Sequence, residues 1–185
     1  MGFCYRSVER ARLAWVELAI SVLMALATVG LVVSTLTPAH AYEVAASIPG
    51  YPPGTIVVSQ HQKRLYLNLP DGEALRYPVA VGKMGKQWHG ASVIDGKYVE
   101  PAWAPPPEVK RAEPWLPSYI PGGSPRNPMG VRALTLSGDQ YAIHGTNRPG
   151  SIGTAASFGC IRMFNSDILD LYERVEVGTP VVMLP

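Results

Sequence analysis

The chain has 185 residues, which is room for one domain of ordinary size. Hydrophobic residues make up 47% of it and charged residues 16%, so it can build a hydrophobic core and lacks the composition of a disordered protein. Its formal net charge is only +2, and lysine and arginine are not clustered, so nucleic-acid binding has no support. Eighteen glycines and eighteen prolines favour short strands joined by turns over a helical bundle.

Residues 1–41 have the pattern of an export signal. Three arginines precede the uncharged apolar run Leu18–Leu36, and "AHA" at 39–41 supplies the small residues that signal peptidase accepts. The run is also long enough to span a bilayer, so a permanent anchor is the alternative. We therefore expect 1–41 to be a signal peptide or signal anchor and the remainder to be exported to the periplasm or cell envelope. Membrane contact is expected only through this segment, if it is not cleaved.

Residues 42–53 are expected to be a linker and 54–185 the folded domain. The domain opens with three runs rich in β-branched and aromatic residues, 55–60, 64–69 and 74–82. Short polar turns, one of them carrying Asp-Gly, separate these runs. The pattern predicts an antiparallel meander of three strands.

Residues 83–132 form a proline-rich insertion that holds three of the four tryptophans. A strand is expected over 91–99, broken at its central Asp-Gly, and a short helix around 108–111 follows three prolines. Trp103 and Trp115 are expected to pack against the domain. A long insertion of this type is typical of segments that cover a site.

Regular structure resumes with strands over 131–136 and 140–145. The segment 165–175 predicts a helix, capped by Asn165 or Ser166, whose apolar residues share one face and pack on a sheet. A last strand follows in "GTPVVML". With about eight strands and one main helix near the C-terminus, the expected fold class is mainly β.

The segment from Ser157 to Met163 has the side chains that a cysteine nucleophile needs. In an extended chain Phe158, Cys160 and Arg162 face one way, and the apolar Ile161 and Met163 face the core. Cys160 is the one cysteine that remains after 1–41 is removed. Arg162 is expected to favour the thiolate of Cys160. Gly159, directly before Cys160, lets a substrate carbonyl approach the backbone N–H groups.

His144 ends a predicted strand and is the candidate base for this thiol, because a free imidazole titrates near neutrality. An inert thiol and a surface histidine account equally well for the same pattern. A zinc site built from Cys160, His144, His89 and His61 is a further alternative, but their spacing matches no zinc motif. We expect His89 to lie on the surface and Trp88 to pack.

The segment "IHGTNRPGSIGTAASFGCIRM" resembles the signature of the L,D-transpeptidase catalytic domain family, also called the YkuD domain. The parts of the chain before and after this segment are also similar to the family, so the resemblance covers Pro52 to Leu184. Phe158 is a departure, because many members have a second histidine there, and "GKMGKQWHGAS" replaces the family's common "TPxGxF". An H-G-T segment and a later S-x-G-C-x-R block carry the likeness, at His144, Gly145, Thr146, Ser157, Gly159, Cys160 and Arg162.

The resemblance implies a β-sandwich or barrel and a cysteine-dependent acyltransferase that acts on peptidoglycan stem peptides. Cys160 would attack the carbonyl between diaminopimelate and the following D-Ala of a donor tetrapeptide, forming a thioester. The amine of a second stem would resolve the thioester as a 3→3 cross-link in cell-wall biogenesis. Water or a protein amine as acceptor would give an L,D-carboxypeptidase or a wall-protein attachment enzyme. A non-catalytic peptidoglycan-binding module is less favoured, because it would need no thiol.

The resemblance also implies residue roles. His144 would act as base and then as acid, oriented by the backbone carbonyl of Gly145, while the N–H groups of Gly159 and Cys160 would hold the oxyanion. No metal or organic cofactor is implied, and such enzymes are typically acylated by carbapenems. The residues expected to bind substrate are Arg162, Ser157, Thr146 and Phe158.

Overall fold

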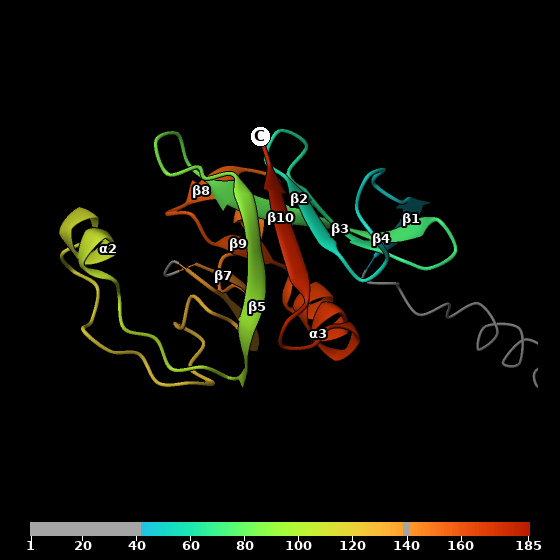
Figure 1. Ribbon diagram of the computed structural model, residues 1–185. Helices are drawn as coiled ribbons and strands as arrows, with labels where there is room; N and C mark the ends of the chain where they lie inside the picture. The colour runs from blue at the N-terminus through green and yellow to red at the C-terminus, as the bar shows by residue number, and fades with distance from the viewer. Residues whose placement is uncertain (1–41, 139–140) are drawn as a thin grey trace, which may run out of the picture. The chain divides into compact units, whose positions relative to one another are not determined.

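The β-rich sequence forms a mainly β fold, as predicted, in a computed structural model that describes residues 42–138 and 141–185. Figure 1 shows the strands wrapped around a shared interior with α3 beside them. The helical elements described are α2 (Pro107–Ala112), the 3₁₀ turn η1 (Pro149–Ser151) and α3 (Asn165–Arg174). The strands described are β1 (Glu43–Ala46), β2 (Ile56–Ser59), β3 (Arg64–Asn68), β4 (Glu73–Gly82), β5 (Gly90–Val99), β6 (Arg132–Leu136), β7 (Ala142–His144), β8 (Ala155–Ser157), β9 (Ile161–Met163) and β10 (Pro180–Leu184).

Strands of the described part form a closed, barrel-like ring of hydrogen-bonded neighbours. The order around the ring is β4, β3, β2, β10, β5, β6, β7 and β9, and β9 pairs again with β4. The meander predicted from the sequence is confirmed as β2, β3 and β4, which pair antiparallel in that order. The last strand, β10, lies parallel to β2 and antiparallel to β5, and so joins the meander to the second half of the ring.

The ten-residue strand β4 closes the ring. Its first part pairs with β3 on one edge and with β1 on the other. Farther along, Val79 and Ala80 pair with Met163 and Arg162 of β9, and the end of the strand pairs with β8. Long-range pairing with β4 therefore fixes the position of the segment that contains Cys160.

The interior of the ring is apolar and includes one face of α3. Ile168, Leu171 and Val175 are buried in this core and Tyr172 packs at its edge, as the helical spacing predicts. The helix contacts β6 and β7, the strands next to the candidate site. Each large apolar side chain that is fully buried contributes about 1.5–3 kcal/mol, so the core holds these strand ends in place.

Two predictions of local structure are wrong. The range 42–53, expected to be a linker, contains β1, whose four residues pair with β4. Its sequence "EVAA" has little β-propensity, so the strand depends on a partner that is distant in the sequence. Helix α3 begins at Asn165 itself, and its N-cap is Phe164, with no side-chain cap. The side chain of Asn165 bonds to the chain beside His144 instead.

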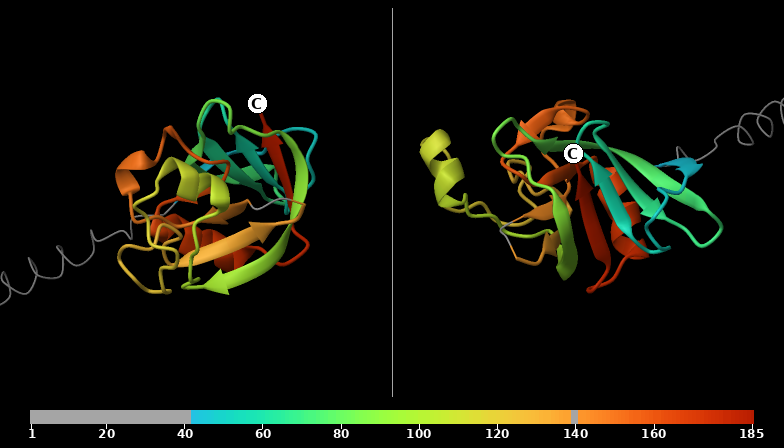
Figure 2. Two further views of the ribbon diagram at one scale, coloured as in Figure 1. Left: turned by 90° about the vertical axis from the view of Figure 1, so that its left-hand side faces the viewer. Right: turned by 45° about the horizontal axis from the view of Figure 1, so that its top comes forward.

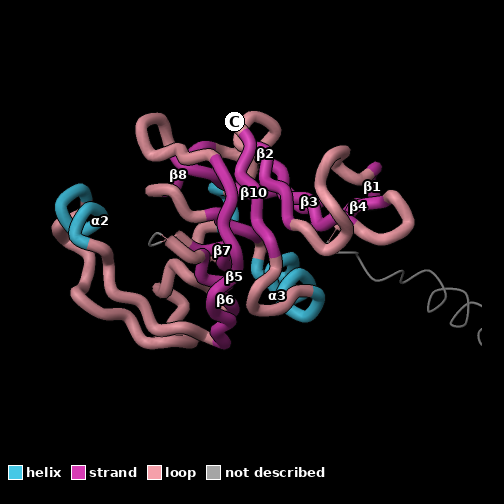
Figure 3. The backbone as a smooth tube through the Cα atoms, viewed as in Figure 1, coloured by secondary structure: helices cyan, strands magenta, loops and turns pink. Residues whose placement is uncertain are grey.

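Residues 100–131, which connect β5 to β6, form an arm that reaches past the ends of the strands and carries α2 (Figures 1 and 3). Figure 2 shows the same arm end-on, in yellow, in front of the orange strands. Inside the arm, Trp103 and Ile120 form an antiparallel bridge. The buried side chain of Asn127 closes its base by donating to the carbonyls of Pro101 at 2.8 Å and Pro121 at 3.1 Å. The short helix predicted around 108–111 is confirmed as α2.

The predicted signal segment, 1–41, lies outside the described residues. Within the part of the chain that the structure describes, no helix is both long enough and apolar enough to cross a membrane.

Replacing a core residue of the ring tests this architecture. Leu134 on β6 is fully buried, so Leu134→Ala is expected to lower the free energy of unfolding by about 2–5 kcal/mol through lost burial and the cavity left behind. Urea denaturation followed by circular dichroism measures the change. Val177→Ala, at a residue that is 60% exposed, is the control and should change it by less than about 0.5 kcal/mol. Equal effects of the two changes would contradict the described core.

Candidate active site

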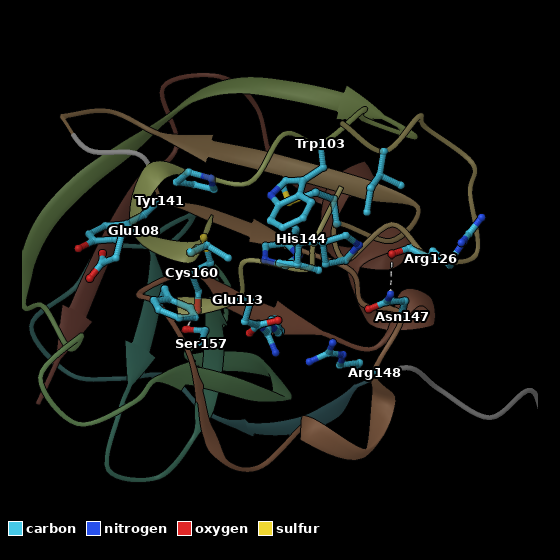
Figure 4. Close-up of a pocket in the computed structure, with 18 of the residues that line it drawn as sticks. Trp103, Glu108, Glu113, Arg126, Tyr141, His144, Asn147, Arg148, Ser157 and Cys160 are labelled. Atoms are coloured by element: carbon cyan, nitrogen blue, oxygen red, sulfur yellow. Dashed lines mark hydrogen bonds between the residues drawn. The ribbon is translucent and has the colours of Figure 1, made fainter. Parts of the chain in front are cut away.

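A pocket lies between the arm and the ends of β7 and β9 (Figure 4). The arm supplies one wall, from Trp103 to Met129, and the strand ends supply the floor. The prediction that the insertion covers a site therefore agrees with the lining of this pocket. The lining residues used below are Trp103, Glu113, Leu116, Ile120, Arg126, Tyr141, His144, Arg148, Ser157, Phe158, Cys160 and Arg162.

Parallel pairing of β7 and β9 brings His144 and Cys160 to the same pocket. Ile143 pairs with Ile161 and His144 with Arg162, so Cys160, directly before β9, lies level with the start of β7. The backbone N–H of Ala142 accordingly faces the Cys160 thiol. Figure 4 shows both side chains in the middle of the pocket. Two residues sixteen positions apart in the sequence thus lie on neighbouring segments of the sheet.

The ring of His144 is held in one tautomer. Its Nδ1 lies 2.7 Å from the backbone carbonyl of Gly145. Since a carbonyl oxygen can only accept, Nδ1 carries the proton, and Nε2 of the neutral ring keeps its lone pair. Gly145 thus has the geometry that the resemblance implied for it. A Cβ at this glycine would stand 2.2 Å from Oδ1 of Asn165, so only glycine fits.

The environment of His144 keeps the imidazole neutral. The side chain is 3% exposed, and burial, followed by the positive charge of Arg162, lowers its pKa to about 4. Backbone carbonyls of Gly145, Pro128 and Met129 oppose this shift. At neutral pH the ring is therefore unprotonated at Nε2, as proton abstraction from a thiol requires.

The Cys160 thiol is also neutral in this environment. Burial raises its pKa, and the Ala142 amide and the Arg162 guanidinium oppose the shift without reversing it. The expected effect of Arg162 agrees with this environment, because its charge lowers the pKa of Cys160, but burial outweighs it. Activation of this thiol requires proton transfer to a base rather than a pre-formed thiolate–imidazolium pair.

The turn before Cys160 is held by Ser157 and Trp88. The hydroxyl of Ser157 donates to the Cys160 carbonyl at 2.6 Å and accepts the Gly159 N–H at 3.1 Å. The indole of Trp88 stacks on Tyr141, with ring centroids 5.4 Å apart, and donates to the Gly159 carbonyl at 3.0 Å. The predicted continuous extended segment is therefore bent at Gly159, whose φ is +119°.

The remaining predicted site residues are placed as follows. Phe158, Cys160 and Arg162 line the pocket, while Ile161 and Met163 are buried in the core, as the alternation predicts. The ring of Phe158 lies under the Lys83 ammonium, 3.7 Å from its centroid. The roles of Phe158 and Arg162 in binding substrate stay predictions.

Two predicted residues are engaged in local structure. The Gly159 amide, expected to hold an oxyanion, already donates to Ser157. Thr146 is buried and borders a second, separate pocket rather than the one beside Cys160. Its N–H donates to Oδ1 of Asn165 at 3.0 Å, and its hydroxyl accepts the N–H of Arg148 at 3.0 Å. Thr146 and Ser157 therefore shape the loops on either side of the site.

The sequence predicts that the insertion covers a site, but it does not predict which residues of the arm line the pocket. Trp103, expected only to pack, lines the pocket, and Glu113 faces it from the residues after α2. Trp115, also expected to pack, is 75% exposed. The expectations for two other residues are confirmed, since Trp88 packs and His89 is exposed. No local signal marks Trp103 or Glu113, because the arm's irregular path decides which side chains face the strands.

The zinc alternative requires a group of side chains that can bind one ion. Among residues 42–138 and 141–185, no three His, Cys, Asp or Glu side chains are grouped as ligands of one ion.

Comparison with known families decides the relationship of the chain. Residues 53–183 match the family model of the L,D-transpeptidase catalytic domain. The chain belongs to this family. The probable L,D-transpeptidase ErfK/SrfK of Escherichia coli K12 is 39% identical over 137 residues, which cover 70% of this chain and 43% of that protein. The putative L,D-transpeptidase YkuD of Bacillus subtilis is 38% identical over 141 residues, which cover 74% of this chain and 72% of that protein.

Solved structures support the fold of this L,D-transpeptidase family member. L,D-transpeptidase 3 from Mycobacterium tuberculosis matches with a TM-score of 0.57 at 14% identity, over 71% of this chain and 60% of that one. The catalytic domain of an L,D-transpeptidase from E. faecium, acylated by ertapenem, matches with a TM-score of 0.55 at 18% identity, over 73% of this chain and all of that one. At these identities the matches show a shared fold.

The pH dependence of acylation tests the neutral pair. Protonated His144 cannot accept the thiol proton, so the acylation rate of Cys160 by a carbapenem should fall only as the pH drops through about 4. Stopped-flow measurement from pH 3.5 to 8 gives the profile, and denaturation curves at each pH show that the protein stays folded. An acidic limb centred near 6.5, the ordinary histidine value, would contradict a buried neutral ring.

A change at Gly159 tests the close packing before the nucleophile. A Cβ there would stand 2.3 Å from the Tyr141 ring, and the backbone has a positive φ, so Gly159→Ala should cost at least about 1–3 kcal/mol of stability and slow acylation. Gly150→Ala is the matched control, because nothing lies within 4 Å of its Cβ position. Thermal unfolding and the carbapenem acylation rate are the two measurements. If the two variants behave alike, the close approach to Tyr141 does not constrain the site.

Proposed function

We propose that the protein is an L,D-transpeptidase that acts on peptidoglycan stem peptides through an acyl-enzyme on Cys160 and forms 3→3 cross-links. The observation that carries this proposal is the pairing of β7 with β9, which brings His144 and Cys160 to the lining of one pocket. Membership of the family supports the reaction class. The matching part spans 43% of the ErfK/SrfK and YbiS relatives from E. coli, so substrate and acceptor are part of the proposal.

Acylation would begin with proton transfer from the Cys160 thiol to Nε2 of His144. The sulfur then attacks the carbonyl between diaminopimelate and D-Ala, and the negative charge moves to the carbonyl oxygen. His144, now protonated, gives its proton to the leaving amine of D-Ala, and a thioester remains. The fixed tautomer supports this sequence, since the Gly145 carbonyl holds Nδ1–H through both transfers.

Stabilisation of the tetrahedral oxyanion would come from backbone N–H groups at the bend before β9. The Gly159 amide is turned toward Ser157 Oγ, so the oxyanion would share or replace that hydroxyl as acceptor. The Cys160 amide follows directly in the chain. Arg162, two residues beyond the nucleophile and on the same wall of the pocket, would hold a substrate carboxylate.

An amine acceptor is favoured over water by the composition of the pocket. Trp103, Leu116, Ile120 and Phe158 line part of it with apolar surface, which would offer a hydrolytic water no hydrogen bond. The thioester would then persist until the amine of a second stem arrives and passes its proton to His144. Export of residues 42–185 to the cell envelope, where such stems occur, belongs to the same proposal.

Product analysis with Cys160→Ala tests the reaction. The full-length chain is incubated with disaccharide-tetrapeptide, and products are separated and weighed by mass spectrometry. We expect dimers with a 3→3 link and released D-Ala from the native protein, and neither from Cys160→Ala, whose loss of activity should exceed about 10³-fold.

A second variant separates chemistry from folding in this test. Cys160→Ser keeps the shape of the nucleophile and should bind the tetrapeptide while turning over far more slowly, because a hydroxyl is a much weaker nucleophile than a thiol. Tripeptide without dimer would replace the cross-linking proposal by a carboxypeptidase. Equal product from native protein and Cys160→Ala would contradict the acyl-enzyme.

A further inference from the structure

A second arginine shares the pocket with Arg162. Arg148 lies in the loop after β7 and Arg162 on β9, and both line the pocket that contains Cys160. Burial lowers the pKa of Arg162, and the neighbouring charge of Arg148 lowers it further. Two guanidinium groups near each other in a partly buried site repel, so the site is more stable when an anion lies between them.

The loop that presents Arg148 is preorganised. The N–H of Arg148 donates to Oγ1 of Thr146 at 3.0 Å. The Arg148 carbonyl accepts both the N–H and the hydroxyl of Ser151, at 3.0 and 2.8 Å. Pro149 starts the 3₁₀ turn directly after it. The backbone of Arg148 is therefore fixed, while its side chain is exposed to the pocket and makes no ion pair that the structure records within the described residues.

An acidic residue of the arm faces these two arginines. Glu113 follows α2 and lines the same pocket, and its charge raises the pKa of Arg162. In Figure 4 the guanidinium of Arg148 points toward Glu113, whereas the side chain of Arg126 points away from Cys160. The Glu113 carboxylate thus faces the arginines from the arm, and the structure records no ion pair between it and either arginine within the described residues.

We propose that Arg148 and Arg162 form a carboxylate subsite beside the nucleophile, and that Glu113 of the arm competes with the substrate for it. This inference rests on the proposed function for the identity of the substrate as a stem peptide. A stem carboxylate would bind the two guanidinium groups with charge-assisted hydrogen bonds and displace Glu113. Arg148 is then a specificity-determining residue that selects stems with a free carboxylate over stems with a carboxamide.

Binding to the full-length chain in a Cys160→Ala background tests this subsite without turnover. Disaccharide-tetrapeptide and three analogues, each with one carboxylate converted to a carboxamide, are titrated by calorimetry. One analogue should bind about 10-fold more weakly than the free acid, and the identity of that analogue names the recognised carboxylate. Adding Arg148→Gln should weaken binding of the acid about 10-fold and leave binding of that analogue unchanged.

Three further variants make the test specific. Glu113→Gln should tighten binding of the acid by about 3-fold, the opposite direction to Arg148→Gln, because the competing carboxylate is gone. Arg148→Lys should restore part of the affinity, since it keeps the charge. Arg64→Gln, at an arginine of β3 that does not line this pocket, is the matched control and should bind like the parent within about 2-fold.

The outcomes separate this subsite from the proposed reaction. If all four ligands bind equally, or if Arg148→Gln weakens the acid and every analogue alike, the subsite is overturned even where the native protein forms cross-links. If selectivity follows Arg148 in the Cys160→Ala background while the native protein forms no product, the subsite stands and the reaction fails.

Discussion

The parallel pairing of β7 with β9 is the contact on which the site depends. It brings the segments that contain His144 and Cys160 side by side, and the pairing of β9 with β4 closes the ring next to them. The buried faces of Ile143 and Ile161 hold the two strands in register, since a slip by one residue would turn the thiol and the imidazole away from the pocket. The catalytic geometry is thus a consequence of the core.

Burial of this pair sets its electrostatics. It lowers the pKa of His144 and raises that of Cys160, so both groups are neutral at rest, and the proposed acylation would begin with proton transfer between them. The fold also supplies the arm, which forms one wall of the pocket and brings the Glu113 carboxylate toward Arg148 and Arg162. An ion pair between Lys86 and Glu108 also links α2 to the β4–β5 loop.

The sequence predicted those features that depend on short-range patterns. Alternating apolar residues gave the meander and the outward face of Cys160 and Arg162, and helical spacing gave the buried face of α3. Features that depend on distant partners were missed or wrong. Strand β1 is stable only beside β4, and Asn165 uses its side chain across the loop instead of capping its own helix. The neutral state of Cys160 follows from burial, which the sequence near the thiol does not reveal.

The central claim is that Cys160, activated by His144, carries the acyl group of the stem peptide. The most direct measurement is the intact mass of the full-length chain, quenched in acid milliseconds to seconds after mixing with tetrapeptide in the absence of an acceptor. We expect an added mass equal to the donor minus D-Ala, located on Cys160 by peptide mapping and absent from Cys160→Ala. An unmodified chain at every time point while D-Ala is released, or an adduct on another residue, would contradict the claim.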